Sequence, residues 1–382
     1  MTEEKFNKAQ PKMRGMTRAV ALWSLGGLGA LAVIYIGLWF FLSHQLYSSV
    51  QGWIEQQRKS GMQVRYTDSR RGGFPFAVTA IFDQPMIISD RQPVSFAWHG
   101  PQAAVSLKPW QPWHVHIALG GAQQIAITKQ GKTVTWQGQA ETLSADVRLG
   151  FSSRTHLTMN FAKIDMRTTT GGVKKSKALQ QLQLEQGRIG INRFRQKNMT
   201  EKTPSLIVSA DITGLHVPKS LPLILGHDFS KIALEAQVLG SLPRSLEACP
   251  LLAWRDAGGT IEIERAEIIH GPLNLKANGT VALDSNLQPV GAFSTQIQGF
   301  FDIITVLRDR GMIKPRVALT ARFVLGALSK RPPEGGRPRL DVALSIQNQK
   351  VFVGPLAIMK LPSIRWETVL RKTAPKPSEG TP

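Results

Sequence analysis

Few side chains in this sequence have the types and spacing that chemistry requires, and one pair of histidines comes closest. His114 and His116 are two residues apart on an expected strand, so both point to one face and could share a metal ion. No third ligand lies nearby in the sequence, and the flanking Trp110 and Trp113 favour packing or an interface instead. We therefore expect no metal site.

Carboxylates and the thiol give no stronger signal. Glu262, Glu264 and Glu267 could in principle pair for acid–base work, but they alternate with isoleucines, as on the solvated face of a strand. Cys249 precedes Pro250 in an apolar setting, where a buried, inert thiol is expected. A single cysteine also excludes a disulfide within the chain and a multi-cysteine zinc site.

Motifs of known catalytic mechanisms are missing from the sequence. It contains no G-x-S-x-G elbow, no H-E-x-x-H pair and no G-x-x-x-x-G-K-[ST] loop. We expect no enzyme activity, no catalytic residues and no cofactor, and an extracytoplasmic hydrolase is the least favoured hypothesis.

The segment from Arg70 to Phe76 is the best candidate for a binding site. Arg70 and Arg71 stand beside an aromatic turn, and such guanidinium groups could bind an anionic lipid head group or a partner loop. Alternatively, the glycine pair and the proline turn one strand into the next, with Phe74 and Phe76 in the core. The second interpretation is favoured, and Arg70, Arg71, Phe74 and Phe76 remain the candidate ligand-binding or partner-binding residues.

The element nearest to this segment is a long apolar stretch at the N-terminus. Residues 19–42 carry no charge, and a helix of that length spans a hydrocarbon core of about 30 Å. Aromatic residues at both ends are typical of interfacial anchors, and we assign this role to Trp23, Tyr35, Trp39 and Phe40. The sequence therefore predicts a transmembrane helix.

The flanks of this stretch predict its orientation. Residues 1–18 hold five basic and two acidic residues, whereas residues 43–57 hold one acidic and no basic residue. The positive-inside bias places residues 1–18 in the cytoplasm and the rest of the chain outside it, after a single pass. A cleavable signal peptide has a shorter apolar region and a small-residue cleavage site, so an uncleaved signal anchor is expected.

The remainder of the chain reads as mainly β. Residues 43–60 predict a juxtamembrane helix, since Leu46, Val50 and Trp53 have helical spacing. Beyond them, runs of period two alternate with Gly, Pro and Asn turns, most clearly over residues 258–299. We expect a first β region over residues 61–205, a second over residues 206–366 and a disordered tail over residues 367–382. Individual expectations include a strand at Arg316–Phe323 and short helices at Pro250–Asp256 and Phe300–Arg310.

Several passages together resemble a bacterial family, the one filed as domain of unknown function 2125. The resemblance covers residues 46–366 and is carried by Arg71-Gly72-Gly73-Phe74-Pro75-Phe76, Trp254-Arg255-Asp256-Ala257-Gly258-Gly259-Thr260, Gly271-Pro272-Leu273 and Leu361-Pro362-Ser363-Ile364-Arg365-Trp366. In architecture the pattern is also similar to AsmA-like envelope proteins, which have a signal anchor followed by amphipathic β-meanders. The resemblance implies a large curved antiparallel meander, a taco-like groove or a sandwich, in a protein of the bacterial inner membrane with its bulk in the periplasm. It brings no catalytic residues.

The charge of the chain fits this location. The 382 residues have a formal net charge of +21, of which +18 lies after residue 18 and is dispersed rather than concentrated in one run. Dispersed positive charge on an anchored protein suits an anionic membrane or lipid, and we expect no nucleic-acid partner.

Two functions remain open at this point. In the first, the protein binds or passes a lipid or another hydrophobic ligand in envelope maintenance, with the lipid bilayer as its other partner. In the second, it is a scaffold whose sheet forms a filled sandwich core and whose loops bind envelope proteins. Period-two alternation does not separate them, because an open and a filled sheet need the same pattern.

Overall fold

The computed structural model describes residues 14–90, 94–129, 131–150, 154–169, 180–194, 200–242, 248–331, 335–353 and 356–364. The first thirteen residues of the predicted cytoplasmic tail and the predicted disordered tail lie outside these ranges. Within them, the chain forms one large antiparallel sheet and four helices, which confirms the mainly β fold class.

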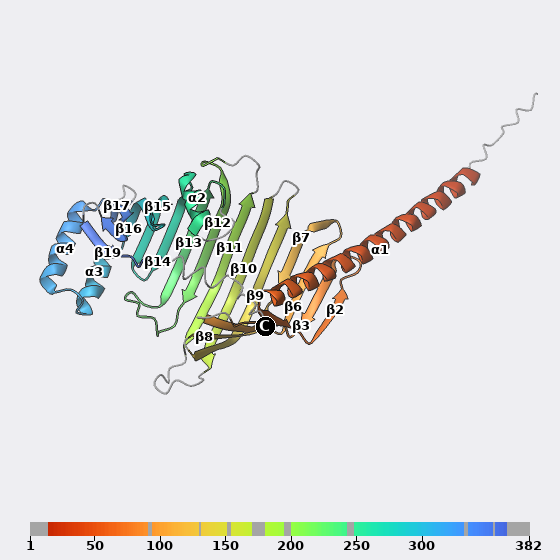
Figure 1. The fold of residues 1–382 in the computed structure, drawn as a ribbon, viewed down its shortest axis with the longest axis horizontal. Helices are drawn as coiled ribbons and strands as arrows, with labels where there is room; N and C mark the ends of the chain where they lie inside the picture. The colour runs from red at the N-terminus through yellow and green to blue at the C-terminus, as the bar shows by residue number, and fades with distance from the viewer. Residues whose placement is uncertain are drawn as a thin grey trace, which may run out of the picture.

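Helix α1 (Arg14–Lys59) is a single helix that covers both the predicted span and the predicted juxtamembrane segment. It projects away from the sheet over its N-terminal half (Figure 1). Its last carbonyls are capped by Ser60 and Gly61, and Gly61 supplies the positive φ of 85° that turns the chain into the first strand. By length and composition α1 could cross a membrane, as an anchor or a signal sequence.

In the described ranges, nineteen strands make up the sheet. Their bounds are β1 Met62–Arg65, β2 Asp68–Gly72, β3 Val78–Asp83, β4 Met86–Ser89, β5 Val94–His99, β6 Gln102–Lys108, β7 Gln111–Ala118, β8 Gly121–Lys129, β9 Lys132–Leu149, β10 Arg154–Thr169, β11 Gln181–Phe194, β12 Pro204–His216, β13 Asp228–Leu239, β14 Ile261–His270, β15 Leu273–Leu283, β16 Pro289–Gln298, β17 Arg339–Gln347, β18 Lys350–Val353 and β19 Leu356–Lys360. Strands β11 and β12 pair along most of their length, so the two predicted β regions are parts of one sheet.

The first eight strands divide into two walls. β2, β3, β6 and β7 form one wall, here the β7 wall, and β1, β4, β5 and β8 form the other, here the β8 wall. Both walls join β9, because the second half of β9 pairs with β7 and its first half pairs with β8. The chain crosses between the walls every second strand.

A sharp bend, here the crease, separates the walls. It falls at the short links between strands, such as Gly100–Pro101 and Leu119–Gly120. Hydrogen bonds continue across it, from Gln84 N to the Pro101 carbonyl (2.9 Å) and from Leu119 N to the Leu143 carbonyl (2.8 Å). In β10 the crease lies at Lys163, which has a positive φ of 47°. The registers of β9 to β12 leave out Lys163 and its neighbours Glu141, Glu185 and Gly214, so the sheet bends where its strand pairing is locally interrupted.

The apolar sides of the two walls face each other across α1. One buried cluster joins the helix to both walls: Trp39, Leu46 and Ile54 of α1, Val64 of β1, Val78, Ala80 and Phe82 of β3 and Leu107 of β6. The inside of the bend is thus the apolar side, and α1 packs at one end of it. We call this concave apolar side of the sheet the trough.

The other helices lie farther along the chain. α2 (Ala248–Asp256) and α3 (Phe300–Asp309) agree with the predicted helices to within two residues. α3 and the last helix, α4, lie at the opposite end of the sheet from α1 (Figure 1).

The predicted strand at Arg316–Phe323 is wrong, because these residues lie in α4 (Pro315–Leu328). Pro315 occupies the first helical turn, where its missing N–H costs nothing, and alanines favour the helix. Ala318 is buried while Leu319 and Phe323 are exposed, a pattern that does not alternate residue by residue.

Candidate functional site

A continuous apolar face runs through the trough from α1 to the far end of the sheet. Residues directly opposite each other in a ladder share a face, so one row of the sheet can be followed through the registers. It runs through Val78, Leu107, Val115, Val147, Leu157, Ile191, Val208, Ala236, Ile263, Gly279, Phe293 and Leu344. Apart from the glycine, every member is apolar.

Burial changes along this row. Val78 and Leu107, which pack at the α1 end, are 1% and 8% exposed. From Val115 to Leu344 each member is half-buried. A filled sandwich would bury this row completely, and among the described residues no second layer of strands or helices covers the apolar face of the central strands.

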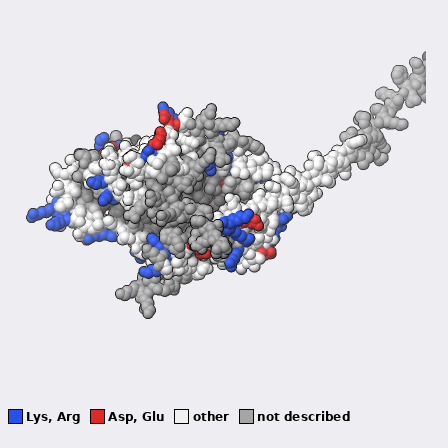
Figure 2. Space-filling model, viewed as in Figure 1, with Lys and Arg blue, Asp and Glu red and all other residues white. Residues whose placement is uncertain are grey.

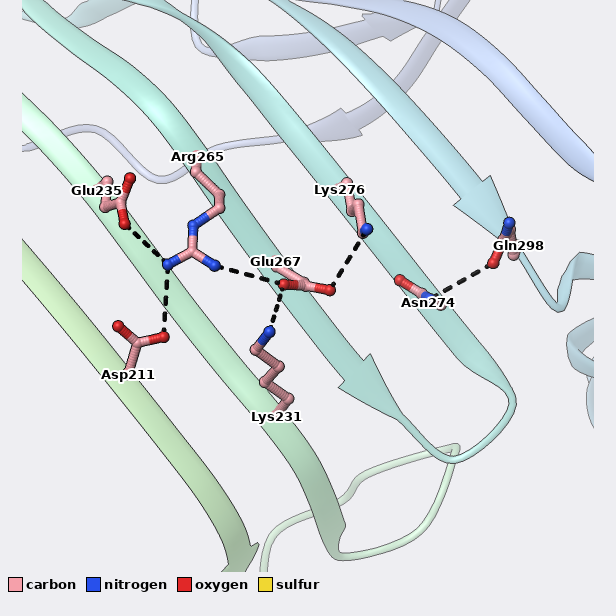
Figure 3. Close-up of polar contacts among 8 residues, drawn as sticks. All are labelled: Asp211, Lys231, Glu235, Arg265, Glu267, Asn274, Lys276 and Gln298. Atoms are coloured by element: carbon pink, nitrogen blue, oxygen red, sulfur yellow. Dashed lines mark hydrogen bonds and ion pairs between the residues drawn. The ribbon is translucent and has the colours of Figure 1, made fainter. Parts of the chain in front are cut away.

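The opposite face of the same strands is charged (Figure 3). Arg265 on β14 contacts Glu235 (2.8 Å) and Asp211 (3.5 Å) on the two preceding strands, and its other terminal nitrogen lies 3.8 Å from Glu267. Lys231 lies 2.8 Å from the nearly buried carboxylate of Glu267, and this hydrogen bond lowers the pKa of Glu267 against the opposing effect of burial. One side of these strands is therefore charged and the other is apolar.

The second feature of the site is the junction between α1 and the turn that joins β2 to β3. The Tyr35 hydroxyl donates a hydrogen bond to the Pro75 carbonyl, and the Trp39 indole donates one of 2.7 Å to the Ala77 carbonyl. The Trp39 and Phe74 rings meet edge-on with centroids 5.4 Å apart. The helix and the turn are thus tied together by two hydrogen bonds and an aromatic contact.

The candidate binding residues of this segment divide into two pairs. Arg70 forms an ion pair of 3.0 Å with Asp83, and the guanidinium of Arg71 lies 4.2 Å from the centre of the Tyr47 ring. Both arginines therefore have partners within the protein. Phe74 and Phe76 are 53% and 74% exposed, so the favoured interpretation that placed them in the core is wrong.

The four predicted membrane anchors fall into an exposed pair and a pair that the sheet covers. Trp23 and Phe40 are exposed, as an anchor in lipid would be. Trp39 is 6% exposed and Tyr35 is half-buried, so the sheet covers these two side chains instead. A sequence signal for this contact exists, because Tyr35, Trp39, Leu42 and Leu46 form one helical stripe that continues from the span toward the juxtamembrane segment.

Metal chemistry finds no support among the described residues. His114 and His116 both contact Asp146, at 3.1 and 3.0 Å. Burial raises the pKa of Asp146, but the hydrogen bonds from His116 and His114 outweigh it and lower the pKa overall. In the described ranges no group of three or more His, Cys, Asp or Glu side chains is placed to hold a metal ion. Lys and Arg are scattered over the visible face rather than gathered in one patch (Figure 2).

Comparison with known proteins now identifies the family. The model of the family described as "Uncharacterized protein conserved in bacteria (DUF2125)" matches residues 39–362. The chain belongs to the DUF2125 family. The match begins at Trp39, the residue that ties α1 to the turn, and the DUF2125 region includes nearly the whole sheet.

No curated protein and no solved structure matches this DUF2125 chain. The looser similarity to AsmA-like envelope proteins stays a prediction.

Proposed function

We propose that this DUF2125 protein is anchored in the bacterial inner membrane by α1, with its N-terminus in the cytoplasm, and that its trough binds the acyl chains of a lipid or another hydrophobic ligand. The role is binding or transfer in envelope maintenance rather than catalysis. One observation carries the proposal: the apolar row of the central strands is continuous and half-buried, with a charged face behind it.

Physical chemistry supports a lipid in this position. Exposed apolar area costs about 25 cal/mol per Å² relative to burial, so a face of this length gains from a ligand that covers it. An acyl chain is apolar along its whole length and can follow a row that crosses many strands. The net positive charge of the chain would favour an anionic head group at the edge of the sheet.

Two adjacent residues on β10 provide a matched test. Met159 lies on the apolar face, because it pairs with Ala145 and Ile189, and Thr158 points to the opposite face. A photo-crosslinking amino acid is placed at either position in the full-length protein, which is crosslinked in bacterial membranes and analysed by mass spectrometry. We expect lipid adducts at position 159 and several-fold fewer at position 158.

The opposite outcome would favour the scaffold function. If position 159 gives no lipid adduct and the gently extracted protein carries no lipid, the trough does not bind lipid. Protein adducts at both positions would then indicate an envelope partner.

A further inference from the structure

We infer that the turn joining β2 to β3, residues 73–77, inserts into the bilayer beside α1. The inference rests on the proposed anchoring of the protein by α1. The molecules that surround this turn are lipids, in the leaflet that contains the C-terminal end of the uncharged span.

The position of the turn along α1 is the first argument. Its carbonyls at Pro75 and Ala77 accept hydrogen bonds from Tyr35 and Trp39, and both donors lie within the uncharged stretch that ends at Leu42. At a rise of about 1.5 Å per residue, Leu42 lies roughly 10 Å farther along the helix than Tyr35. The turn therefore lies alongside the span rather than beyond it, and a bilayer that contains the end of the span must surround the turn.

The exposed side chains at this level are the second argument. Phe74 and Phe76 are 53% and 74% exposed on the turn, and Phe40 and Phe41 are 63% and 64% exposed on the helix beside it. Such a group of exposed aromatic side chains is unfavourable in water and favourable at a membrane interface.

Backbone hydrogen bonding is the third argument, because an unpaired polar group is costly in lipid. Within the turn, Ala77 N donates to the Gly73 carbonyl (2.7 Å), and Pro75 has no N–H to satisfy. The carbonyls of Pro75 and Ala77 are already taken by Tyr35 and Trp39. The turn thus enters lipid with the carbonyls of Gly73, Pro75 and Ala77 and the N–H of Ala77 already paired.

The arginines on β2 fit the same placement. Arg71 precedes Phe74 by three residues, which is roughly 10 Å along an extended chain. That distance places its guanidinium near the head groups when the phenylalanines reach the acyl chains. A protein partner would have to displace lipid from the helix to reach the turn, so we assign this surface to the bilayer.

Depth-dependent fluorescence quenching tests the inference in the full-length protein. With Cys249→Ser as background, a nitrobenzoxadiazole probe is attached at Phe76→Cys, at Phe74→Cys or, as a matched control at the other end of β2, at the exposed Asp68→Cys. The protein is reconstituted in vesicles of phosphatidylcholine and phosphatidylglycerol. We expect spin-labelled lipid to quench the probes at 74 and 76 several-fold more than the probe at 68, and aqueous iodide to show the reverse order.

Two results would overturn the inference. Equal iodide quenching at 76 and 68 would place the turn in water, and a probe at 76 that is protected from both iodide and spin-labelled lipid would assign the surface to a protein partner. The probes at 74 and 76 report independently, so failure of one variant to fold leaves the other.

These outcomes are separable from those of the proposed function. Lipid quenching at 76 together with no lipid adduct at position 159 would support the turn and reject the trough. Release of the protein from vesicles by alkaline carbonate would reject the anchor, and the insertion of the turn with it.

Discussion

The indole nitrogen of Trp39 donates a hydrogen bond of 2.7 Å to the carbonyl oxygen of Ala77, which ties helix α1 to a turn of the sheet. Trp39 is 6% exposed and also contacts the Phe74 ring, so one side chain joins helix, turn and core. Four measurable consequences follow from this junction and from the faces of the sheet.

Replacing Trp39 tests the junction. Trp39→Phe leaves the Ala77 carbonyl without its donor and opens a space in the core, so the free energy of unfolding should fall by about 1–3 kcal/mol. Thermal unfolding of the detergent-solubilised protein measures the loss. Phe41→Leu is the control, because Phe41 is 64% exposed and should change the free energy by less than about 0.5 kcal/mol. Equal effects of the two changes would contradict the role of Trp39.

Adjacent glycines test the geometry of the turn. Gly73 has a positive φ of 94°, and a Cβ there would lie 2.6 Å from the Ala77 carbonyl oxygen, whereas a Cβ at Gly72 meets nothing within 4 Å. Gly73→Ala should lower the free energy of unfolding by about 1–3 kcal/mol and Gly72→Ala by far less. Limited proteolysis of the detergent-solubilised protein at the turn is the readout, with faster cleavage expected only for Gly73→Ala. Matching cleavage rates for the two variants would argue against the described turn.

Two valines on the same apolar row test whether the trough is open. Val78 is 1% exposed, and Val208 is half-buried on the same face. Val78→Ala should cost about 2 kcal/mol, since it removes buried methyl groups and leaves a cavity, and Val208→Ala should cost less than about 1 kcal/mol. Chemical denaturation of the two variants compares these losses. If Val208→Ala costs as much as Val78→Ala, the trough is filled.

Acid titration tests the charged face. The hydrogen bond from Lys231 lowers the pKa of Glu267 below its ordinary value of 4.5, so the stabilisation is fully present above that value and is lost as the pH falls through the lower, folded-state pKa. Glu267→Gln should cost about 1–3 kcal/mol at neutral pH, and the difference from the unmodified protein should shrink in acid. Unfolding free energies measured between neutral pH and pH 3 check this.

The control for that titration is Glu262→Gln, on the same strand but exposed. Its effect on the free energy of unfolding should be small, since Glu262 is exposed. A difference between the Glu267 variant and the unmodified protein that stays constant into acid would contradict the assignment.

The parts of the fold that could be predicted from sequence are those whose patterns depend on neighbouring residues along the chain. Period-two alternation predicted strands such as β14 to β16, and helical spacing predicted that α1 continues past its apolar stretch, because both patterns are set by neighbours along the chain. The prediction of a strand at Arg316–Phe323 is wrong because a short apolar run fits both the strand period and the helix period. Pro315 and the alanines favour the helix that forms there.

The site was predictable only in part. Arg70 to Phe76 was singled out, but whether Phe74 and Phe76 are buried depends on α1, whose contact with the turn joins residues about forty positions apart. The crease could not be predicted from sequence either, because many strands bend at one level and the sequence of a single strand does not indicate the bend. Whether the trough is open could not be read from alternation, because burial is a property of the packed layers.

The strand order has a consequence for how the protein folds and varies. From β9 to β18 every strand pairs with the strands that precede and follow it in sequence, as neighbouring units do in a repeat protein. Folding can then propagate from one strand to the next with short loop closures, except at the two longer connections that carry α2 and the pair α3 and α4. Insertion or deletion of a whole hairpin would lengthen or shorten the trough while the end that packs on α1 keeps its contacts.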